Sequence, residues 1–164
     1  MLYEVKCGIF ALYFTFIYLK MTVQQIKLVK KSWFLFRQIK PAVVADVFYS
    51  RLFYDHPELR NLFPKDMASQ YEKLIATLNV VVARLDKLEE LTVDIAALAI
   101  RHRDYGTKPK HYASVGQALL WTLEKGLGYD WNEEVAEAWL TCYTLLSNTM
   151  IDAANETPQY FNEK

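Results

Sequence analysis

Glycine and proline are scarce in this chain of 164 residues, which contains five of each. Hairpins depend on such residues in their tight turns, and no stretch alternates polar and apolar positions for long. A β fold therefore has little support. From Thr22 onward the apolar residues instead recur at the three- and four-residue spacing of helices, which predicts a single all-α domain.

The chain also lacks a net charge, because nineteen Lys and Arg balance nineteen Asp and Glu. Without a net positive field it has no general attraction for nucleic acid or for an anionic membrane. Cysteine is rare as well, and Cys7 and Cys142 lack the close spacing of a zinc site or a redox-active pair. We therefore expect reduced thiols in a cytoplasmic protein that does not bind nucleic acid.

The main apolar run is too short for a membrane-spanning helix. From Gly8 to Leu19 only Thr15 is clearly polar, and this run falls short of the roughly 20 residues that a bilayer requires. It also lacks the small-residue cleavage site of a secretory signal. Residues 1–20 are then either a membrane-associating extension or upstream sequence before a true start at Met21, and only the extension would allow membrane association. We expect the folded domain at residues 21–156 and a C-terminal tail at 157–164.

Seven helical segments are expected after Met21. Their approximate bounds are 22–38, 41–55, 57–62, 67–85, 90–103, 109–126 and 132–154. Three of them begin at or next to a proline, where the first turn of a helix tolerates this residue. Thr22 and Gln25 have the spacing of a capping box. Glycines at 106, 126 and 128 are expected to break the chain between helices.

The stretch LAIRHRDYGTKPKHY, residues 98–112, places a histidine at the end of an apolar helical stripe. His102 follows Leu91, Ile95 and Leu98 at steps that keep all four on one face. A histidine in this position is commonly a core residue bonded to a backbone carbonyl. A neutral imidazole that faces an apolar space is also the axial ligand that a haem iron needs. The pattern alone leaves both interpretations open.

Two polar residues on other helices bear on this choice. Gln70 lies at the edge of the stripe that includes Tyr71 and Leu74, and Tyr49 shares a face with Leu52 in the segment 41–55. Gln70 is ordinarily a boundary residue that reaches water, and Tyr49 is ordinarily core filler. Across a cavity from His102, the Gln70 amide could instead donate to a ligand bound on the far side of a metal.

Taken together, the segments VFYSRLFYDHPELRNLF, DMASQYEKL and IRHRDYGTKPKHYASVGQALL resemble the globin family. The resemblance is strongest to the globin domain of bacterial flavohaemoglobins and their single-domain relatives, and it covers approximately residues 23–154. It implies a globin fold of about seven helices around a haem pocket, with haem b as cofactor. In this interpretation His102 matches the proximal iron ligand, and Tyr49 and Gln70 match the distal tyrosine and glutamine.

The resemblance also implies how the cofactor is enclosed. Phe63 matches the phenylalanine packed on the haem face, and Leu74 the apolar residue one turn beyond Gln70. Leu98 and Val115 complete an apolar lining that would exclude water and slow oxidation of the iron. Trp33 and Trp139 match packing tryptophans of the first and last helices.

The proximal side departs from the family pattern. Tyr112 matches a tyrosine that, with a glutamate, polarises the proximal histidine in flavohaemoglobins. The position of that glutamate is Ala154, so the peroxidase-like push on the iron lacks its usual carboxylate. Asp152 or Glu156 could replace it only if the register of the last helix shifted.

The resemblance implies O2, NO and CO as gaseous ligands and leaves two functions open. One is a protein that binds O2 reversibly for storage, delivery or sensing. The other is an NO dioxygenase that makes nitrate with electrons from a separate reductase, because flavohaemoglobins carry flavin and nicotinamide domains for which no sequence remains after Ala154. We expect O2 binding together with NO conversion, in a monomer or homodimer. A helical interaction module without haem is a third interpretation.

Overall fold

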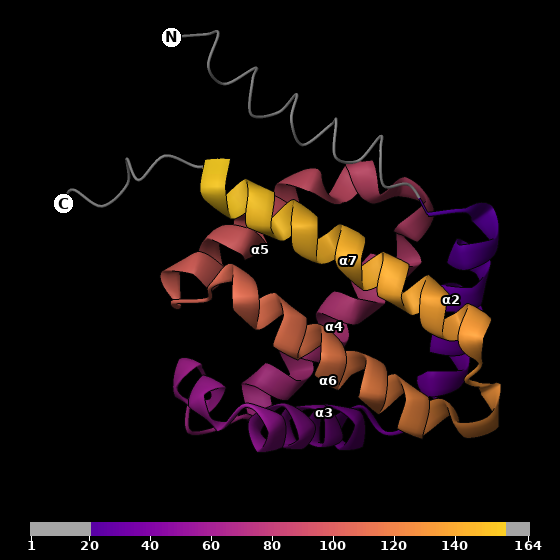
Figure 1. Cartoon of the computed structure of the whole chain (residues 1–164), viewed down its shortest axis with the longest axis horizontal. Helices are drawn as coiled ribbons and strands as arrows, with labels where there is room; N and C mark the ends of the chain where they lie inside the picture. The colour runs from indigo at the N-terminus through magenta and orange to yellow at the C-terminus, as the bar shows by residue number, and fades with distance from the viewer. Residues whose placement is uncertain (1–20, 157–164) are drawn as a thin grey trace, which may run out of the picture.

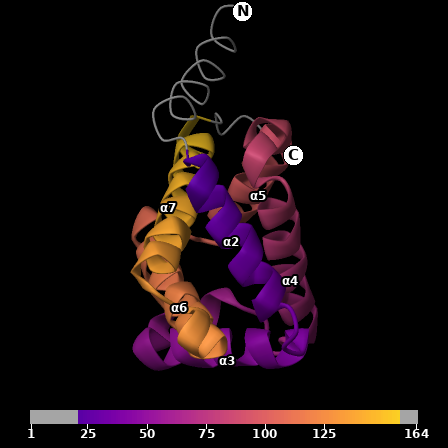
Figure 2. The ribbon, with the colours of Figure 1, turned by 90° about the vertical axis from the view of Figure 1, so that its right-hand side faces the viewer.

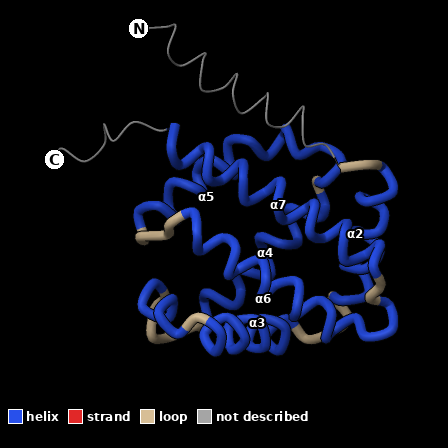
Figure 3. Tube along the Cα trace, viewed as in Figure 1, coloured by secondary structure: helices blue, strands red, loops and turns tan. Residues whose placement is uncertain are grey.

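The computed structural model describes residues 21–156, and within this range the chain consists of helices joined by short loops (Figure 3). The elements in chain order are α2 (Val23–Phe36), α3 (Pro41–Asp55), the 3₁₀ segment η1 (Pro57–Leu62), α4 (Ala68–Ala83), η2 (Leu85–Leu91), α5 (Thr92–Asp104), α6 (Pro109–Leu127), η3 (Gly128–Asp130) and α7 (Glu133–Glu156). The all-α prediction is confirmed. The two expected terminal segments, 1–20 and 157–164, lie outside the described residues.

The helix starts follow local chemistry. Proline occupies the first turn of α3, η1 and α6, where its missing N–H has no helical partner to lose. At the start of α2, Gln25 N donates to Thr22 Oγ1 over 3.1 Å, and Thr22 N donates to Gln25 Oε1 over 2.9 Å. The capping box predicted from the sequence is therefore confirmed.

Two expected breaks are placed differently in the structure. The gap expected between residues 85 and 90 is the 3₁₀ segment η2, in which Lys87 leaves helical geometry at φ −143° and ψ 42°. The break expected at residues 126–128 does not begin at Gly126, because this residue lies inside α6, where the Phe36 ring occupies the space that a Cβ would need. The helix ends instead at Gly128, whose φ of +54° favours glycine.

The helices that pack against α4 differ from those that pack against α5. α3 packs against both α4 and α6, whereas α7 packs against α5, α6 and α2. Figure 1 shows α3 along the lower edge, with α6 and α7 running side by side above it. Figure 2 shows α2 between α7 on one side and α4 with α5 on the other. Thus α4 and α5 are supported by different helices and are connected in the chain by η2.

Two tryptophans hold the centre of this arrangement. The rings of Trp33 on α2 and Trp139 on α7 meet edge to face at 5.9 Å, and both are buried. Trp139 Nε1 donates to Ser32 Oγ over 2.9 Å, and Trp33 Nε1 donates to Asn79 Oδ1 over 3.0 Å. Both indole N–H groups are thereby satisfied inside the core, as the burial of tryptophan requires.

Among residues 21–156, none of the helices is both long enough and apolar enough to cross a bilayer.

Candidate functional site

His102 lies in the last turn of α5 and is half-buried. Its Nδ1 is 2.9 Å from the carbonyl oxygen of Leu98, one turn earlier. A carbonyl only accepts, so Nδ1 carries the hydrogen and Nε2 keeps its lone pair. Burial lowers the pKa of His102, although the bond to Leu98 opposes the change. The residue is therefore a neutral imidazole with one nitrogen available as a ligand.

Tyr112 on α6 lies beside this imidazole. The two ring centroids are 6.5 Å apart, and their planes differ by 26°. The backbone carbonyl of Tyr112 accepts a 2.6 Å hydrogen bond from the hydroxyl of Tyr143 on α7. The sequence analysis did not identify Tyr143, which connects the helix beside the imidazole to α7.

The position where the family pattern has a glutamate carries the methyl side chain of Ala154. The Ala154 carbonyl oxygen accepts a 3.1 Å hydrogen bond from Arg103 Nη1, which joins the ends of α5 and α7. α7 is one continuous helix from Glu133 to Glu156. The acceptor for Nδ1 of His102 is a neutral backbone carbonyl, as described above.

Tyr49 on α3 is almost fully buried, with 4% of its surface exposed. Its ring contacts those of Phe48 at 4.8 Å, Phe63 at 5.4 Å and Phe53 at 5.8 Å. Burial raises the pKa of the Tyr49 hydroxyl to about 12, while a side-chain hydrogen bond with Gln70 acts in the opposite direction. That direction is expected when the amide N–H of Gln70 donates to the phenol oxygen. The phenol O–H itself then remains a donor.

Gln70 is half-buried near the start of α4, and the next residue, Tyr71, contacts Tyr49 as well. The rings of Tyr49 and Tyr71 are stacked with centroids 5.5 Å apart and planes only 8° from parallel. The Tyr71 hydroxyl donates to Asp46 Oδ1 over 2.8 Å. The sequence analysis placed Tyr71 in an apolar stripe and did not consider Asp46. Asp46 lies three residues before Tyr49, and this helical spacing could have indicated that Asp46 lies near Tyr49 on one face of the helix.

The four apolar residues predicted to line a pocket are all partly exposed at the margin of the core. They are Phe63, Leu74, Leu98 and Val115, and they come from the η1–α4 connection, α4, α5 and α6. Partly exposed apolar side chains gain about 25 cal/mol for each Å² that a ligand removes from water. These apolar side chains and the available Nε2 of His102 are the kinds of group that haem requires, because haem presents apolar faces and needs one axial nitrogen from the protein.

The other two histidines, like His102, have a local partner at Nδ1. His56 Nδ1 is 3.5 Å from Glu58 Oε1, and His111 Nδ1 accepts a 3.2 Å hydrogen bond from the backbone N–H of Lys108. Both belong to the polar ends of helices. The structure therefore favours His102 among the three as a ligand.

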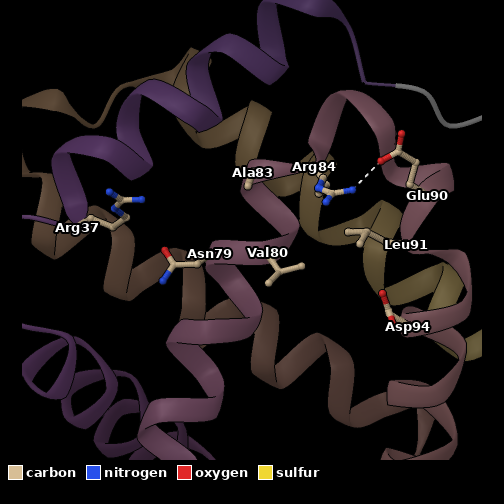
Figure 4. Close-up of a pocket in the computed structure, with 8 residues that line it drawn as sticks. All are labelled: Arg37, Asn79, Val80, Ala83, Arg84, Glu90, Leu91 and Asp94. Atoms are coloured by element: carbon tan, nitrogen blue, oxygen red, sulfur yellow. Dashed lines mark hydrogen bonds and ion pairs between the residues drawn. The ribbon is translucent and has the colours of Figure 1, made fainter.

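A separate open hollow of about 600 Å³ lies where α2 and α4 end and α5 begins (Figure 4). Arg37, Arg84, Glu90 and Asp94 line it, and Arg84 forms a 2.6 Å ion pair with Glu90. The predicted site residues do not line this hollow, so it is distinct both from the surroundings of His102 and from those of Tyr49.

Comparison with known proteins gives matches over most of this region. The family model described as Globin matches residues 46–150, which include Tyr49, Gln70 and His102. The flavohemoprotein of Bacillus subtilis is 32% identical over 107 residues, which are 63% of this chain and 27% of that protein. The chain thus spans about a quarter of the length of this flavohemoprotein.

Two other matches extend over most of both chains. A globin-like protein of Aquifex aeolicus is 30% identical over 128 residues, which are 78% of this chain and 90% of that protein. The solved structure of a bacterial globin from Campylobacter jejuni superimposes with a TM-score of 0.69 at 23% identity, over 82% of this chain and 96% of that one. The structural match supports the fold, and the family model supports the relationship. The chain belongs to the globin family.

Proposed function

We propose that this chain binds haem b through His102, holds O2 reversibly, and converts NO to nitrate with electrons from a separate reductase. The observation that carries the proposal is the half-buried imidazole of His102, which has its Nδ1 occupied by the Leu98 carbonyl and its Nε2 available. The apolar lining and the match to the globin family model support the same cofactor. Haem would supply a ferrous iron that binds diatomic gases and can be oxidised and reduced.

The distal residues give this site its selectivity among gases. The Tyr49 ring is fixed by its aromatic neighbours, and Gln70 bonds to its phenol oxygen. The remaining phenol O–H can donate to a gas molecule that has gained negative charge from the iron, as O2 does. CO gains little charge, so the same donor benefits it less. Leu74 and Phe63 would keep water away from this donor.

On the proximal side, the bond from His102 to a neutral carbonyl favours the second candidate function, which is O2 storage, delivery or sensing without turnover. A carboxylate acceptor would make the imidazole a stronger electron donor and would favour cleavage of the O–O bond. Here the acceptor is the Leu98 carbonyl, and Ala154 occupies the position of the family glutamate. This arrangement favours holding O2 intact, as the second candidate function requires, whereas the conversion of NO and O2 to nitrate breaks the O–O bond.

A visible spectrum of the ferric, ferrous and CO forms tests the cofactor and its ligand. We expect the purified protein to take up one haem and to show a Soret band that shifts when CO is added. His102→Ala should lose the ligand nitrogen and retain haem weakly or not at all. His56→Ala makes the same substitution at a histidine that is not proposed as a ligand, and it should behave like the parent protein. A normal ferrous spectrum in His102→Ala would contradict the ligand assignment.

A turnover measurement separates the two functions. The protein would be mixed with O2, NO and an NADH-dependent flavin reductase with its NADH. The measured quantity is the number of nitrate molecules formed per haem. Many nitrates per haem, dependent on the reductase, support the NO dioxygenase. A yield that stops near one nitrate per haem supports the O2-binding alternative.

A further inference from the structure

Tyr71 and Asp46 form a link beside Tyr49 and Gln70, and neither residue is among the predicted site residues. The Tyr71 hydroxyl donates to Asp46 Oδ1 over 2.8 Å, and the Tyr71 ring lies parallel to the Tyr49 ring at 5.5 Å. Asp46 and Tyr49 both belong to α3, and Tyr71 belongs to α4. The contacts therefore form a closed path from Asp46 through Tyr71 to Tyr49 and back along α3.

This path holds the turn of α4 that carries Gln70. The residue before α4, Met67, makes no capping bond with its side chain, and the bond from Ala68 N to Asp66 Oδ1 connects the turn only to its own loop. The bond from Tyr71 to Asp46 connects the same turn to α3. Because Gln70 and Tyr71 are consecutive, fixing one of them restricts the other.

We propose that Tyr71 and Asp46 are positioning residues that hold Tyr49 and Gln70 in the geometry needed to retain O2. The inference rests on the proposed function, because it concerns the same pocket. Neither residue is required to touch the gas. Tyr71 sets the plane of the Tyr49 ring by stacking, and its bond to Asp46 fixes the distance between α3 and the first turn of α4.

The effect of this link should differ between gases. A hydrogen bond to a charged acceptor weakens steeply when its donor moves out of line. O2 depends on such a bond and CO hardly does. Loosening Tyr71 should therefore speed the release of O2 and leave the release of CO nearly unchanged. A general loosening of the fold would instead speed both.

The test compares O2 and CO dissociation rates in the haem-loaded protein by stopped flow. Tyr71→Phe keeps the stacked ring and removes the hydroxyl, and we expect O2 to dissociate about two- to fivefold faster, in line with the loss of one partly exposed hydrogen bond. Asp46→Ala should have the same effect, and the double variant should add little to either single change. Asp46→Asn keeps an oxygen that accepts the bond and should restore nearly the parent rate. Tyr54→Phe, an exposed tyrosine on α3, is the matched control and should change neither rate.

Two further readouts do not depend on gas release. The C–O stretching band of the CO complex should broaden in Tyr71→Phe and in Asp46→Ala, because the distal donors would sample more positions. Amide hydrogen exchange at Tyr71, whose N–H donates to the Met67 carbonyl, should also quicken in both variants, since the first turn of α4 would open more readily. Tyr54→Phe should leave both signals unchanged.

The outcomes separate the inference from the proposed function. If Tyr49→Phe does not speed O2 release, the assignment of the distal donor fails, and the inference fails with it. If Tyr49→Phe speeds O2 release but Tyr71→Phe and Asp46→Ala do not, only the positioning role is overturned. Equal acceleration of O2 and CO, or additive effects of the two single variants, would also overturn it.

Discussion

At the scale of single residues, the hydroxyl of Tyr49 illustrates how burial decides chemistry. The side chain is 4% exposed, and burial raises its pKa to about 12. The phenol therefore keeps its proton at any physiological pH and remains a donor. When the Gln70 amide donates to this oxygen, the O–H of Tyr49 is left for another acceptor. A tyrosine that the sequence pattern allows as core filler can thus offer a donor beside partly exposed apolar residues.

Tyr49→Phe is the change that isolates this donor. The phenylalanine keeps the ring contacts with Phe48 and Phe63 and removes only the hydroxyl. A hydrogen bond to a charged ligand is worth about 1.5–3 kcal/mol, so we expect O2 to dissociate roughly 10- to 150-fold faster. CO release should change far less. Stopped-flow rates for both gases check this, and equal acceleration of the two would remove Tyr49 from the distal position.

At the scale of elements, the contact between α6 and α7 depends on a residue without a side chain. A Cβ at Gly116 would lie 2.5 Å from Cε1 and 2.8 Å from Cδ1 of Tyr143. The close approach lets the Tyr143 hydroxyl reach the carbonyl of Tyr112, beside His102. The helix pair therefore controls the position of the ring that lies next to the imidazole.

Gly116→Ala tests this contact through the sign of its effect on stability. Overpacking a core costs about 1–3 kcal/mol, whereas alanine in place of glycine in a helix gains about 1 kcal/mol. In the parent protein we expect a net loss of up to about 2 kcal/mol in the free energy of unfolding, measured with urea. In a Tyr143→Ala background the clash is absent, and the same substitution should stabilise the protein. A loss of similar size in both backgrounds would contradict the role of the Tyr143 ring.

The ends of most helices could be predicted from the sequence because their causes are local. The capping box of Thr22 and Gln25 determines where α2 begins, and the prolines that open α3 and α6 determine where these helices begin. Each effect extends over only a few residues. The segment η2 could not be predicted in this way. Leu85, Leu88 and Leu91 are all buried, and Lys87 between them leaves helical geometry. Packing against the rest of the molecule, rather than local preference, sets that shape.

At the scale of the whole molecule, the sequence predicted which residues share a face but not which faces meet. The stripe ending at His102 follows from helical periodicity, and its bond to the Leu98 carbonyl was the expected local partner. The bonds from Tyr71 to Asp46 and from Tyr143 to the Tyr112 backbone join different helices. Such contacts depend on crossing angles that periodicity does not specify.

The buried ionisable groups predict how the whole molecule responds to alkali. Burial raises the pKa of Cys142 on α7 from 9.0 to about 12 and that of Tyr49 from 10.0 to about 12, and it also raises the pKa of Tyr143. In the unfolded chain these groups lose their protons near their ordinary pKa values, while in the folded protein they keep them. Between pH 9 and 12 the unfolded state therefore binds fewer protons, and the free energy of unfolding falls as the pH rises.

The first part of that fall belongs to Cys142 alone, because its unfolded pKa of 9.0 lies below the 10.0 of tyrosine. One such group contributes about 1.4 kcal/mol per pH unit, so urea unfolding should show this slope beginning near pH 9. A steeper slope is expected above pH 10, where the tyrosines with raised pKa values join, namely Tyr49, Tyr71, Tyr112 and Tyr143. Cys142→Ala should flatten the curve between pH 9 and 10 and leave the steeper part in place, even if the variant is less stable at every pH. Between about pH 7 and pH 9 this alkaline loss is nearly absent in both proteins, because the buried thiol and phenols are then mostly protonated in either state. The same slope between pH 9 and 10 with and without the thiol would show that Cys142 ionises in the folded core, and that α7 opens before the molecule unfolds.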